Sequence, residues 1–487
     1  MAQLHDNQYD PWILLLETPF LSQTGTEEVR AYVKSKYNLA LLSLGSYIRA
    51  HSDLKVGMIN MVKDRIAAQD LLDRLKGNPP AVIGVSLYTY NLNITYRMIT
   101  LLKKEFPNSH ICVGGPHVSI FPIETLGLEN IDSIVVGDGE FPFLKICRQV
   151  IKTGSLSRAS LPPGTYIKDS LNTKTPLIPY MEKDLDSLPA PDLNLLGDFR
   201  RYRDFLSNKI MGLLTSSRGC PNLCHYCLSE KSRYRRFSIE HTIDVMQKYS
   251  NMGVEYIEFW DETFNTSKKR VADFADALLN ADLKISWGIR GAVVNNIDSE
   301  TIAKLKRTGL KLIQFGVETT VPRLLSYLHK DIELDQIKAA FDTCRSIGLR
   351  TVANLMINIP GQTRGELLLD LENLKKIRPT YVSISVYNWA PGTTHYMNAL
   401  HDGTFENDFW RAYAKTPFGP EPLTHAETEI PINEVYRIRD RFVSRHYFNL
   451  RYICDYIRSI DLSEISQAVQ IAVLMLKSRL RSAVLLN

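Results

Sequence analysis

The stretch Arg218–Cys227, RGCPNLCHYC, holds three of the seven cysteines of this 487-residue chain within eight residues. Their spacing is C-x3-C-x2-C, whereas the other four cysteines are scattered, at positions 112, 147, 344 and 454. Three thiolates on one loop suit a cubic iron–sulfur cluster with one iron left free. An open position on a metal favours catalysis over scaffolding. A structural zinc site is the alternative, but zinc usually takes four ligands from two separated pairs, and no fourth ligand stands at a familiar spacing.

The composition is that of an ordinary globular protein, with 44% apolar and 23% charged residues. The net charge of +5, from 58 basic and 53 acidic residues, is too balanced to indicate nucleic acid as the main partner. The N-terminal residues lack the pattern of a signal peptide, and no uninterrupted apolar run approaches a membrane span. The odd, scattered cysteines argue against a disulfide framework. We therefore expect a cytoplasmic protein.

The first 150 residues alternate between strand and helix patterns. Apolar runs predict strands at Trp12–Glu17, Lys55–Val62, Ala81–Leu87, His110–Val113 and Ser133–Val136. Helical patterns lie between them, and strands that alternate with helices predict a parallel, doubly wound sheet. Ligands bind such sheets at the carboxyl ends of the strands.

Glycine-rich turns follow two of these strands, as Gly114-Gly115-Pro116-His117 and Gly137-Asp138-Gly139-Glu140. Glycine at such a position lets the backbone approach a ligand closely. The alternative is that the glycines only form tight turns, because glycine punctuates most sheets of this kind.

Residues 156–205 differ in character, since proline-rich segments bracket a polar stretch that is typical of an interdomain linker. Strand–helix alternation then resumes with six predicted strands, Ile210–Ser216, Tyr256–Trp260, Leu283–Ile289, Leu312–Phe315, Thr351–Ile357 and Tyr381–Val386. Six such units are two short of a closed eight-fold barrel and predict a partial (β/α)6 barrel of the TIM type. Its chemistry belongs at the C-terminal ends of the strands, and the cysteine loop follows the first strand directly.

The C-terminal region, residues 396–487, loses the strand signal and is predicted to be helical. Its last helix, around Ile465–Leu486, is markedly apolar. One interpretation is a helix packed in the core, and the other is a surface helix that touches a membrane or a lipid-like substrate. The chain thus divides into four predicted parts, at 1–155, 156–205, 206–395 and 396–487.

The cysteine loop, with Tyr226 directly before the third cysteine and its place after the first barrel strand, closely resembles that of the radical SAM enzymes. The resemblance implies a [4Fe–4S] cluster on Cys220, Cys224 and Cys227, whose free iron is chelated by S-adenosylmethionine (SAM). In that family, one electron from the cluster cleaves SAM to a 5′-deoxyadenosyl radical.

Further segments of the barrel resemble the SAM-binding motifs of this family. Asp261 and Glu262 stand where many members carry Gly-Gly-Glu, so either carboxylate can serve there, and Asn358 stands where glycine is usual. The SAM-binding residues that the resemblance implies are Tyr226, Asp261, Glu262, Arg290, Glu318 and Asn358. For Arg290 and Glu318 the alternative is a structural ion pair in the barrel mouth.

A Rossmann-like domain with these turns, followed by this linker and barrel, resembles the cobalamin-binding class of radical SAM enzymes over about residues 1–395. The resemblance implies that the ends of three strands cradle the cofactor, through Ser86, Leu87, Tyr88, Gly114, Gly115, Pro116, His117, Val136, Gly137, Asp138 and Gly139. Members that ligate cobalt with histidine carry Asp-x-His-x-x-Gly after the first strand, and the loop Thr18–Gly25 has no histidine. We therefore expect no histidine ligand from that loop, and we expect His117 to be a loop residue rather than a cobalt ligand.

The resemblance implies an enzyme that methylates an unactivated carbon of a small-molecule or lipid-like substrate, through methylcobalamin and the deoxyadenosyl radical. A radical cyclisation, ring contraction or oxidative rearrangement with the same cofactors is the main alternative, and a cobalamin sensor or a zinc scaffold are two others. Methylthiotransferases need three further cysteines before the barrel, where this chain has only Cys112 and Cys147. The expected partners are an external electron donor of the flavodoxin or ferredoxin type, no nucleic acid, and a weak contact of the last helix with a membrane surface.

Overall fold

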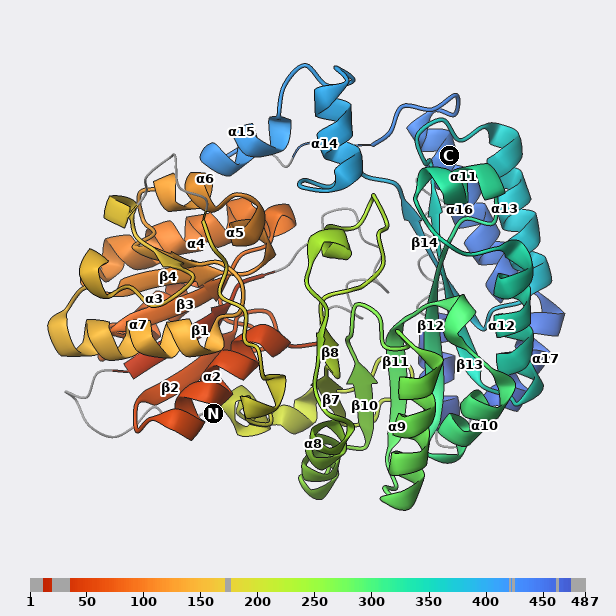
Figure 1. Ribbon diagram of the computed structural model, residues 1–487, viewed down its shortest axis with the longest axis horizontal. Coiled ribbons are helices and arrows are strands. Elements are labelled where there is room, and N and C mark those ends of the chain that lie inside the picture. The colour runs from red at the N-terminus through yellow and green to blue at the C-terminus, as the bar shows by residue number, and fades with distance from the viewer. Residues whose placement is uncertain are drawn as a thin grey trace. The chain divides into compact units, whose positions relative to one another are not determined.

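The computed structural model describes residues 12–19, 36–170, 177–419, 422, 425–460 and 464–473. The chain divides into two structural units. The first comprises Met1–Tyr202 and Glu406–Pro422, and the second comprises Arg203–Phe405 and Leu423–Asn487. Figure 1 follows the elements along the chain from red at the N-terminus to blue at the C-terminus.

A six-stranded sheet forms the centre of the first unit. Its strands lie in the order β2 (Lys55–Asn60), β1 (Trp12–Glu17), β3 (Val82–Ser86), β4 (His110–Gly114), β5 (Ser133–Val135) and β6 (Thr165–Tyr166). All neighbours are parallel except β5 and β6, which pair antiparallel. The predicted doubly wound sheet is confirmed. Its order reverses between β1 and β3, and this switch point is where such sheets bind ligands.

Helices cover both faces of this sheet, which explains why β1 is apolar along its whole length rather than alternating. Four long helices do so: α2 (Leu39–His51), α3 (Ala68–Leu75), α4 (Leu92–Glu105) and α7 (Glu140–Thr153). Helices α2 and α7 pack together over Ile13 and Leu15 of β1. Two short helices follow β4, namely α5 (Pro116–Ile120) and α6 (Pro122–Gly127).

The second unit contains a six-stranded, fully parallel sheet whose spatial order follows the chain. Its strands are β7 (Met211–Leu214), β10 (Tyr256–Phe259), β11 (Ser286–Ala292), β12 (Leu310–Glu318), β13 (Arg350–Ile357) and β14 (Tyr381–Val386). Its edges are β7 and β14, as expected for a partial barrel. A small antiparallel ribbon of β8 (Ser217–Arg218) and β9 (Arg235–Arg236) brackets the cysteine loop.

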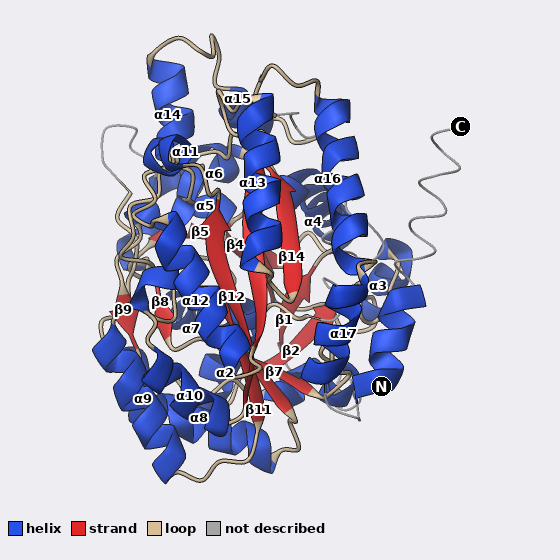
Figure 2. Cartoon of the chain, turned by 90° about the vertical axis from the view of Figure 1, so that its right-hand side faces the viewer, coloured by secondary structure: helices blue, strands red, loops and turns tan. Residues whose placement is uncertain are grey.

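Each barrel strand is connected to the next through helices, as Figure 2 shows for α12 and α13 in front of the strands. They are α8 (Ile239–Asn251), α9 (Lys268–Asn280), α10 (Ser299–Arg307), α11 (Pro322–Tyr327), α12 (Leu334–Ser346) and α13 (Arg364–Ile377). Four of these helices begin after a residue whose side chain accepts a backbone N–H of the first turn: Ser238, Ser267, Asp298 and Thr363. Such caps satisfy donors that the helix itself leaves unpaired.

The C-terminal region is helical, as predicted, with α14 (Thr394–His401), α15 (Phe409–Lys415), α16 (Ile432–Tyr447) and α17 (Leu450–Ser459). Residues 406–422, however, belong to the first unit. Trp410 of α15 is fully buried there, with its ring 5.5 Å from that of Tyr90, and the Tyr413 hydroxyl accepts the backbone N–H of Asn93. Figure 1 shows α15 beside α6, which it contacts.

The described part of the predicted last helix, residues 464–473, is not packed in the core. Ile465, Val469 and Val473 follow one another at helical spacing, and they are 46%, 58% and 43% exposed. The core-packed interpretation is therefore wrong for these residues, and positions 474–487 lie outside the described part of the chain. No helix among the described residues is long and apolar enough to cross a membrane.

A buried ion pair joins this last segment to the amino-terminal end of β13. The guanidinium of Arg350 contacts both carboxylate oxygens of Glu464, at 3.0 and 3.1 Å. The two side chains are only 6% and 3% exposed. Removal of one member of such a pair leaves an uncompensated charge in a low-dielectric environment.

We therefore expect Glu464→Ala to destabilise the second unit by ~3–5 kcal/mol. The matched control is Glu300→Ala, which removes one of the two carboxylate partners of Lys304 on the exposed surface of α10 and should cost less than about 1 kcal/mol. Urea unfolding followed by circular dichroism measures both changes. Equal effects of the two substitutions would contradict the prediction.

Candidate active site

The cysteine loop leaves the barrel at the carboxyl end of β7, and a buried carboxylate on the neighbouring strand fixes its direction. Asp261 accepts hydrogen bonds from the backbone N–H and hydroxyl of Ser216, at 3.0 and 2.8 Å, and from the hydroxyl of Ser217 at 2.5 Å. Burial raises the pKa of Asp261 to about 6, although these hydrogen bonds oppose the shift. Of the two predicted carboxylates, Asp261 is therefore used to hold the loop. Glu262 is exposed, and its carboxylate accepts the backbone N–H of Gly219.

Gly219 is required at the start of the loop because two backbone segments meet there. Its φ is +80°, and a Cβ atom at this position would lie 2.5 Å from the carbonyl oxygen of Arg233. The next residue, Cys220, donates its backbone N–H to the hydroxyl of Ser232. The returning strand of the ribbon thus closes on the loop directly before the first cysteine.

The three predicted cluster ligands lie near one another. Burial raises the pKa of Cys224, the Lys330 ammonium opposes the shift, and Cys227 and Cys220 add to it. Burial also raises the pKa of Cys227, an effect that a hydrogen bond from Ser229 opposes and that Cys220 reinforces. Among the described residues, no group of three His, Cys, Asp or Glu side chains is spaced to hold a single metal ion. A cubane cluster takes each thiolate at a different iron, so its ligands stand further apart.

Hydrogen-bond donors also surround one of the sulfur atoms. Cys220 Sγ lies 3.1 Å from Thr263 Oγ1 and 3.4 Å from Asn222 Nδ2. Hydrogen bonds of this kind tune the potential of iron–sulfur clusters. Three cysteines at the carboxyl end of the barrel, with hydrogen-bonding groups at the sulfur of Cys220, fit a [4Fe–4S] cluster.

Three histidines, which sequence reasoning did not single out as functional, clamp the loop. The backbone N–H of His225 donates to Leu328, and its carbonyl accepts the N–H of His395 at 3.0 Å. The rings of His225 and His329 stack with centroids 4.4 Å apart, and His329 Nδ1 lies 2.7 Å from the carbonyl oxygen of Leu223. The cysteine loop is thereby held against the segment after α11 and the start of α14.

Glu318 and Tyr226, two of the predicted SAM-binding residues, lie together beside the cysteines. Glu318 ends β12 with a φ of +63°, and it is hydrogen-bonded to the Tyr226 hydroxyl. Burial raises the pKa of Tyr226 well above its usual range, with Glu318 acting in the same direction. The cation beside Glu318 is Lys330, whose Nζ lies 3.6 Å from Oε1. The guanidinium of Arg290, in contrast, lies over the ring of Trp260, 4.9 Å from its centroid, and burial lowers its pKa to about 10.

A second buried carboxylate ties together the loops after β12 and β13. Asp370 of α13 accepts the Thr319 and Thr320 hydroxyls at 2.8 and 2.7 Å and the backbone N–H of Thr320. It also accepts the side-chain amide of Gln362, which follows β13. Asp370 accepts a hydrogen bond from each of these groups. Because Thr319 and Thr320 directly follow Glu318, this carboxylate fixes the geometry of that turn.

Asn358 has a structural use of its own. Its φ of +60° explains why glycine is usual at this position. Its Nδ2 donates to the carbonyl oxygen of Ala426 at 2.8 Å, and its Oδ1 accepts the Thr428 hydroxyl at 2.7 Å. The amide thereby anchors the segment that leads into α16.

In the first unit, the turns after β3 and β4 interlock at the predicted cofactor edge. The backbone N–H of Leu87 donates to Gly114, and that of His117 donates to Leu87. Gly115 has a φ of +96°, and a Cβ atom there would lie 2.7 Å from the Ser86 hydroxyl, so only glycine fits. At Gly114, by comparison, a Cβ atom would meet only one backbone oxygen, at 3.5 Å. The Gly114 side of the turn is open enough for a ligand to approach the backbone.

His117 is not the loop residue that the sequence predicts. It lies in the first turn of α5, directly after Pro116, and its side chain is completely buried. Its Nδ1 is 3.0 Å from the Thr89 hydroxyl, and its Nε2 is buried without a hydrogen-bond partner. Burial lowers the pKa of His117 to about 4, so the ring is neutral. An orphaned polar atom at this edge fits a site that a polar cofactor completes.

The third predicted turn serves packing. Gly137 pairs with Tyr180, and a Cβ atom on it would lie 2.1 Å from the carbonyl oxygen of that residue. The neighbouring residues are also used in packing. Tyr180 donates its backbone N–H to Val136 and accepts that of Asp138, and Gly139 lies against Leu44. At this strand end the tight-turn interpretation accounts for the glycines.

A buried acid that sequence reasoning missed lies at the switch point of the sheet. Glu17 ends β1, and its Oε2 accepts the backbone N–H of Asn38 at 3.1 Å and the side-chain amide of Asn60 at 2.7 Å. Its charge also acts on the nearby Tyr88, a predicted cofactor contact. Burial raises the pKa of Glu17 to about 7. The only sequence signal was a carboxylate at the end of an otherwise apolar strand.

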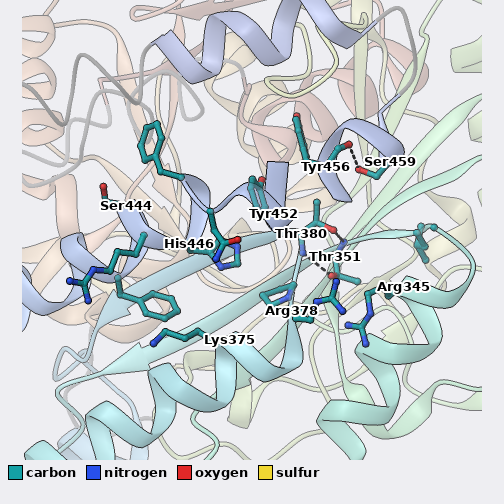
Figure 3. Close-up of a pocket in the computed structure, with 17 residues that line it drawn as sticks. Arg345, Thr351, Lys375, Arg378, Thr380, Ser444, His446, Tyr452, Tyr456 and Ser459 are labelled. Carbon is teal, nitrogen blue, oxygen red and sulfur yellow. Dashed lines mark hydrogen bonds between the residues drawn. The ribbon is translucent and has the colours of Figure 1, made fainter. Parts of the chain in front are cut away.

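A cavity of about 920 Å³ lies at the other end of the barrel strands (Figure 3). Thr351 and Thr380, at the starts of β13 and β14, line it together with Tyr452 and Tyr456 of α17. Because the strands are parallel, this is the end remote from the cysteine loop. Chemistry in barrels of this type occurs at the carboxyl ends of the strands, so this cavity is not the active site.

Comparisons with known proteins agree with this geometry. Residues 214–389 match the family model of the Radical SAM superfamily, and residues 31–146 match that of the B12 binding domain. The uncharacterized methyltransferase PH0819 of Pyrococcus horikoshii is 28% identical over 381 residues, which are 77% of this chain and 81% of that protein. The anaerobic magnesium-protoporphyrin IX monomethyl ester cyclase of Rubrivivax gelatinosus is 23% identical over 358 residues, which are 72% of this chain and 63% of the cyclase.

Solved structures show the same fold. The radical SAM methyltransferase TsrM from Kitasatospora setae superposes with a TM-score of 0.64 at 16% identity, over 81% of this chain and 75% of TsrM. The cobalamin-dependent radical SAM enzyme OxsB superposes with a TM-score of 0.61 at 18% identity, over 89% of this chain and 61% of OxsB.

The chain therefore carries a Radical SAM superfamily domain at residues 214–389 and a B12 binding domain at residues 31–146, and it is an enzyme. Its cofactors are therefore SAM, a [4Fe–4S] cluster and cobalamin.

Glu17 generates a prediction for the pH dependence of stability. A carboxyl group whose pKa is higher in the folded state contributes stability that is complete below its unfolded pKa of 4.5 and lost as the pH rises through about 7. Glu17→Gln keeps a neutral acceptor, so we expect little change at pH 5 and a stabilisation of up to about 3 kcal/mol at pH 8. Urea unfolding at both pH values tests this, with the exposed Glu105→Gln as control. A loss of equal size at both pH values would refute the assignment.

Asp370 generates a prediction for SAM binding. Both carboxylate oxygens of Asp370 accept hydrogen bonds, and Asp370→Asn replaces one of these oxygens by an N–H₂ group that cannot accept. At least one buried donor therefore loses its partner, at a cost of ~1–3 kcal/mol. Because the turn after Glu318 then shifts, we expect the Kd for SAM to rise about tenfold while the iron content stays constant. Equilibrium dialysis with reconstituted protein measures the Kd, and Asp335→Asn on the surface of α12 is the control. Unchanged SAM affinity in Asp370→Asn would show that the network does not position the site.

Proposed function

We propose that this enzyme transfers a methyl group from SAM, by way of cobalamin, to an unactivated carbon of a small-molecule or lipid-like substrate. The observation that carries the proposal is the presence, in one chain, of a three-cysteine loop at the carboxyl end of β7 and a B12-binding domain. The methyltransferase name of the Pyrococcus horikoshii relative supports methyl transfer as the outcome. The fold shared with TsrM, a methyltransferase solved with tryptophan as substrate, is consistent with a small molecule.

The bound cofactors supply the one-electron cleavage of SAM and a methyl group on cobalt, and the residues of this chain hold and tune them. Cys220, Cys224 and Cys227 are the proposed cluster ligands. Asn222 donates a hydrogen bond to Cys220 Sγ and stabilises its thiolate form, and the Thr263 hydroxyl lies 3.1 Å from the same sulfur. An external one-electron donor of the flavodoxin or ferredoxin type is proposed to reduce the cluster.

The proposed SAM contacts surround the cysteines. Tyr226 and Glu318 lie beside them, and a carboxylate at Glu318 can accept two ribose hydroxyls. Glu262, rather than Asp261, is proposed for the methionine amino group, because the oxygens of Asp261 are used by Ser216 and Ser217. Arg290 is proposed for the methionine carboxylate, since a stacked and buried guanidinium keeps its charge.

Apolar side chains around the loop support a substrate with apolar character. Leu223 and Leu228 flank the second and third cysteines and are 57% and 41% exposed. Trp260, two residues before Glu262, is 39% exposed. Exposed apolar groups beside a reactive centre favour binding of an apolar surface and exclude water from the radical.

The cofactor edge of the first unit is proposed at the turns after β3 and β4. Ser86, Tyr88, Gly114 and Gly115 are partly exposed there, and His117 Nε2 is buried without a hydrogen-bond partner. The neutral ring of His117 is proposed to hydrogen-bond a polar group of the cofactor rather than to ligate cobalt. The chain parts 1–155, 156–205, 206–395 and 396–487 are proposed as functional divisions.

A radical cyclisation or oxidative rearrangement without methyl transfer is the second candidate. It is favoured by the likeness to the Rubrivivax gelatinosus cyclase, whose match covers nearly as much of this chain. Both candidates use the same cysteines, so only the products separate them.

The decisive assay uses anaerobically reconstituted protein with SAM, cobalamin and a strong reductant. We expect both 5′-deoxyadenosine and S-adenosylhomocysteine, and Cys224→Ala should lower deoxyadenosine formation at least about a thousandfold, because the cluster loses a ligand. Cys344→Ala, in the core away from the loop, is the matched control. Deoxyadenosine without S-adenosylhomocysteine or a methylated cobalamin spectrum would favour the cyclase candidate. Neither product from the intact protein would overturn both.

A further inference from the structure

Lys330 is a buried cation at the cysteine loop that no motif pointed out. It follows His329, whose φ of +54° turns the chain, and its backbone N–H returns to the carbonyl of Leu325. The side chain is only 9% exposed, and its Nζ lies 3.6 Å from Glu318 Oε1. Lysine is almost never buried to this degree without a charge to balance.

Gly316 provides the space that this lysine occupies. A Cβ atom on Gly316 would lie 3.0 Å from Lys330 Nζ and 2.8 Å from Glu318 Oε1. A side chain at this position would therefore displace the ends of both side chains. The glycine in the segment QFGVETT leaves room for the ammonium and the carboxylate in their present positions.

The segment that carries Lys330 lies against the cysteine loop. The backbone N–H of His225 donates to the carbonyl oxygen of Leu328 at 3.2 Å, and His329 Nδ1 lies 2.7 Å from the carbonyl oxygen of Leu223. At Cys224, Lys330 opposes the rise in pKa that burial causes, and its effect there is larger than the opposite effect of Glu318.

We propose that Lys330 balances the negative charge of the reduced cluster and thereby raises its reduction potential. The inference rests on the proposed cluster site at the three cysteines. A nearby positive charge stabilises the form with one more electron, and net charge is one of the terms that set cluster potentials. The step adds one electron from an external one-electron donor to the cluster, and no bond forms or breaks.

The test is a redox titration of full-length protein with a reconstituted cluster, followed by EPR without SAM or cobalamin. In Lys330→Met, we expect the midpoint potential to become more negative by at least ~59 mV, a tenfold fall in the ratio of reduced to oxidised cluster at fixed potential. Lys330→Arg keeps the charge and should stay near the wild-type potential. Lys338→Met, on the exposed face of α12, is the matched control and should not change it.

Glu318→Gln gives the sign of the effect independently of folding defects. Loss of a negative charge beside the loop should make the potential less negative, opposite to Lys330→Met, and general damage to the loop would not produce shifts of opposite sign. Iron and sulfide analysis on each variant confirms that the cluster is intact.

An unchanged potential for Lys330→Met with a full cluster would overturn the role of Lys330 and leave the proposed function standing. A shift of both variants in the same direction would overturn it as well. If the wild-type protein binds no [4Fe–4S] cluster, the proposed function fails, and this inference fails with it.

Discussion

The hydrogen bonds that Asp261 accepts are the constraint on which the active site depends. Three donors from Ser216 and Ser217 converge on one buried carboxylate, so the chain has a single way to leave β7. The first cysteine, Cys220, follows four residues after Ser216, so this turn sets the direction of the cysteine loop. A carboxylate in a low-dielectric interior is costly to bury, and only such a saturated set of donors offsets the cost. The hydrogen bonds that offset the burial of the Asp261 carboxylate are therefore the same ones that fix the start of the cysteine loop.

The remaining loops of the site are held in place by hydrogen bonds to one another as well as by the strands that they follow. Asp370 joins the turns after β12 and β13, and His395 joins the start of α14 to the cysteine loop. Polar networks with every member satisfied specify one arrangement, because any shift leaves a buried group unpaired. A cofactor site assembled from several strand ends needs such cross-links, since each loop alone is free to move.

Much of the architecture was predictable because its signals are local. The strands at Trp12–Glu17 and Tyr381–Val386 have the predicted bounds, since apolar patterns and the residues that interrupt them act over a few positions. Residues 406–422 were not predictable in the same way. They belong to the first unit because Trp410 and Tyr413 contact residues about 320 positions earlier in the chain. Such contacts produce no periodic pattern in the sequence. Exposure of Ile465, Val469 and Val473 was missed because an apolar helix pattern has the same period on a surface as in a core.

The sequence by itself determined the two α/β sheets, the cofactor class and the cysteine loop, because strand–helix alternation and ligand spacing can be recognised along the chain. The tertiary structure decided which of the candidate residues meet. It assigned Asp261 to the loop and Asn358 to Ala426 and Thr428, and it placed Lys330 beside Glu318. These roles depend on distances between residues that are far apart in sequence. Such distances exist only once the strands have paired, since the physical effect of a charge or a donor is set by what lies within a few ångströms of it.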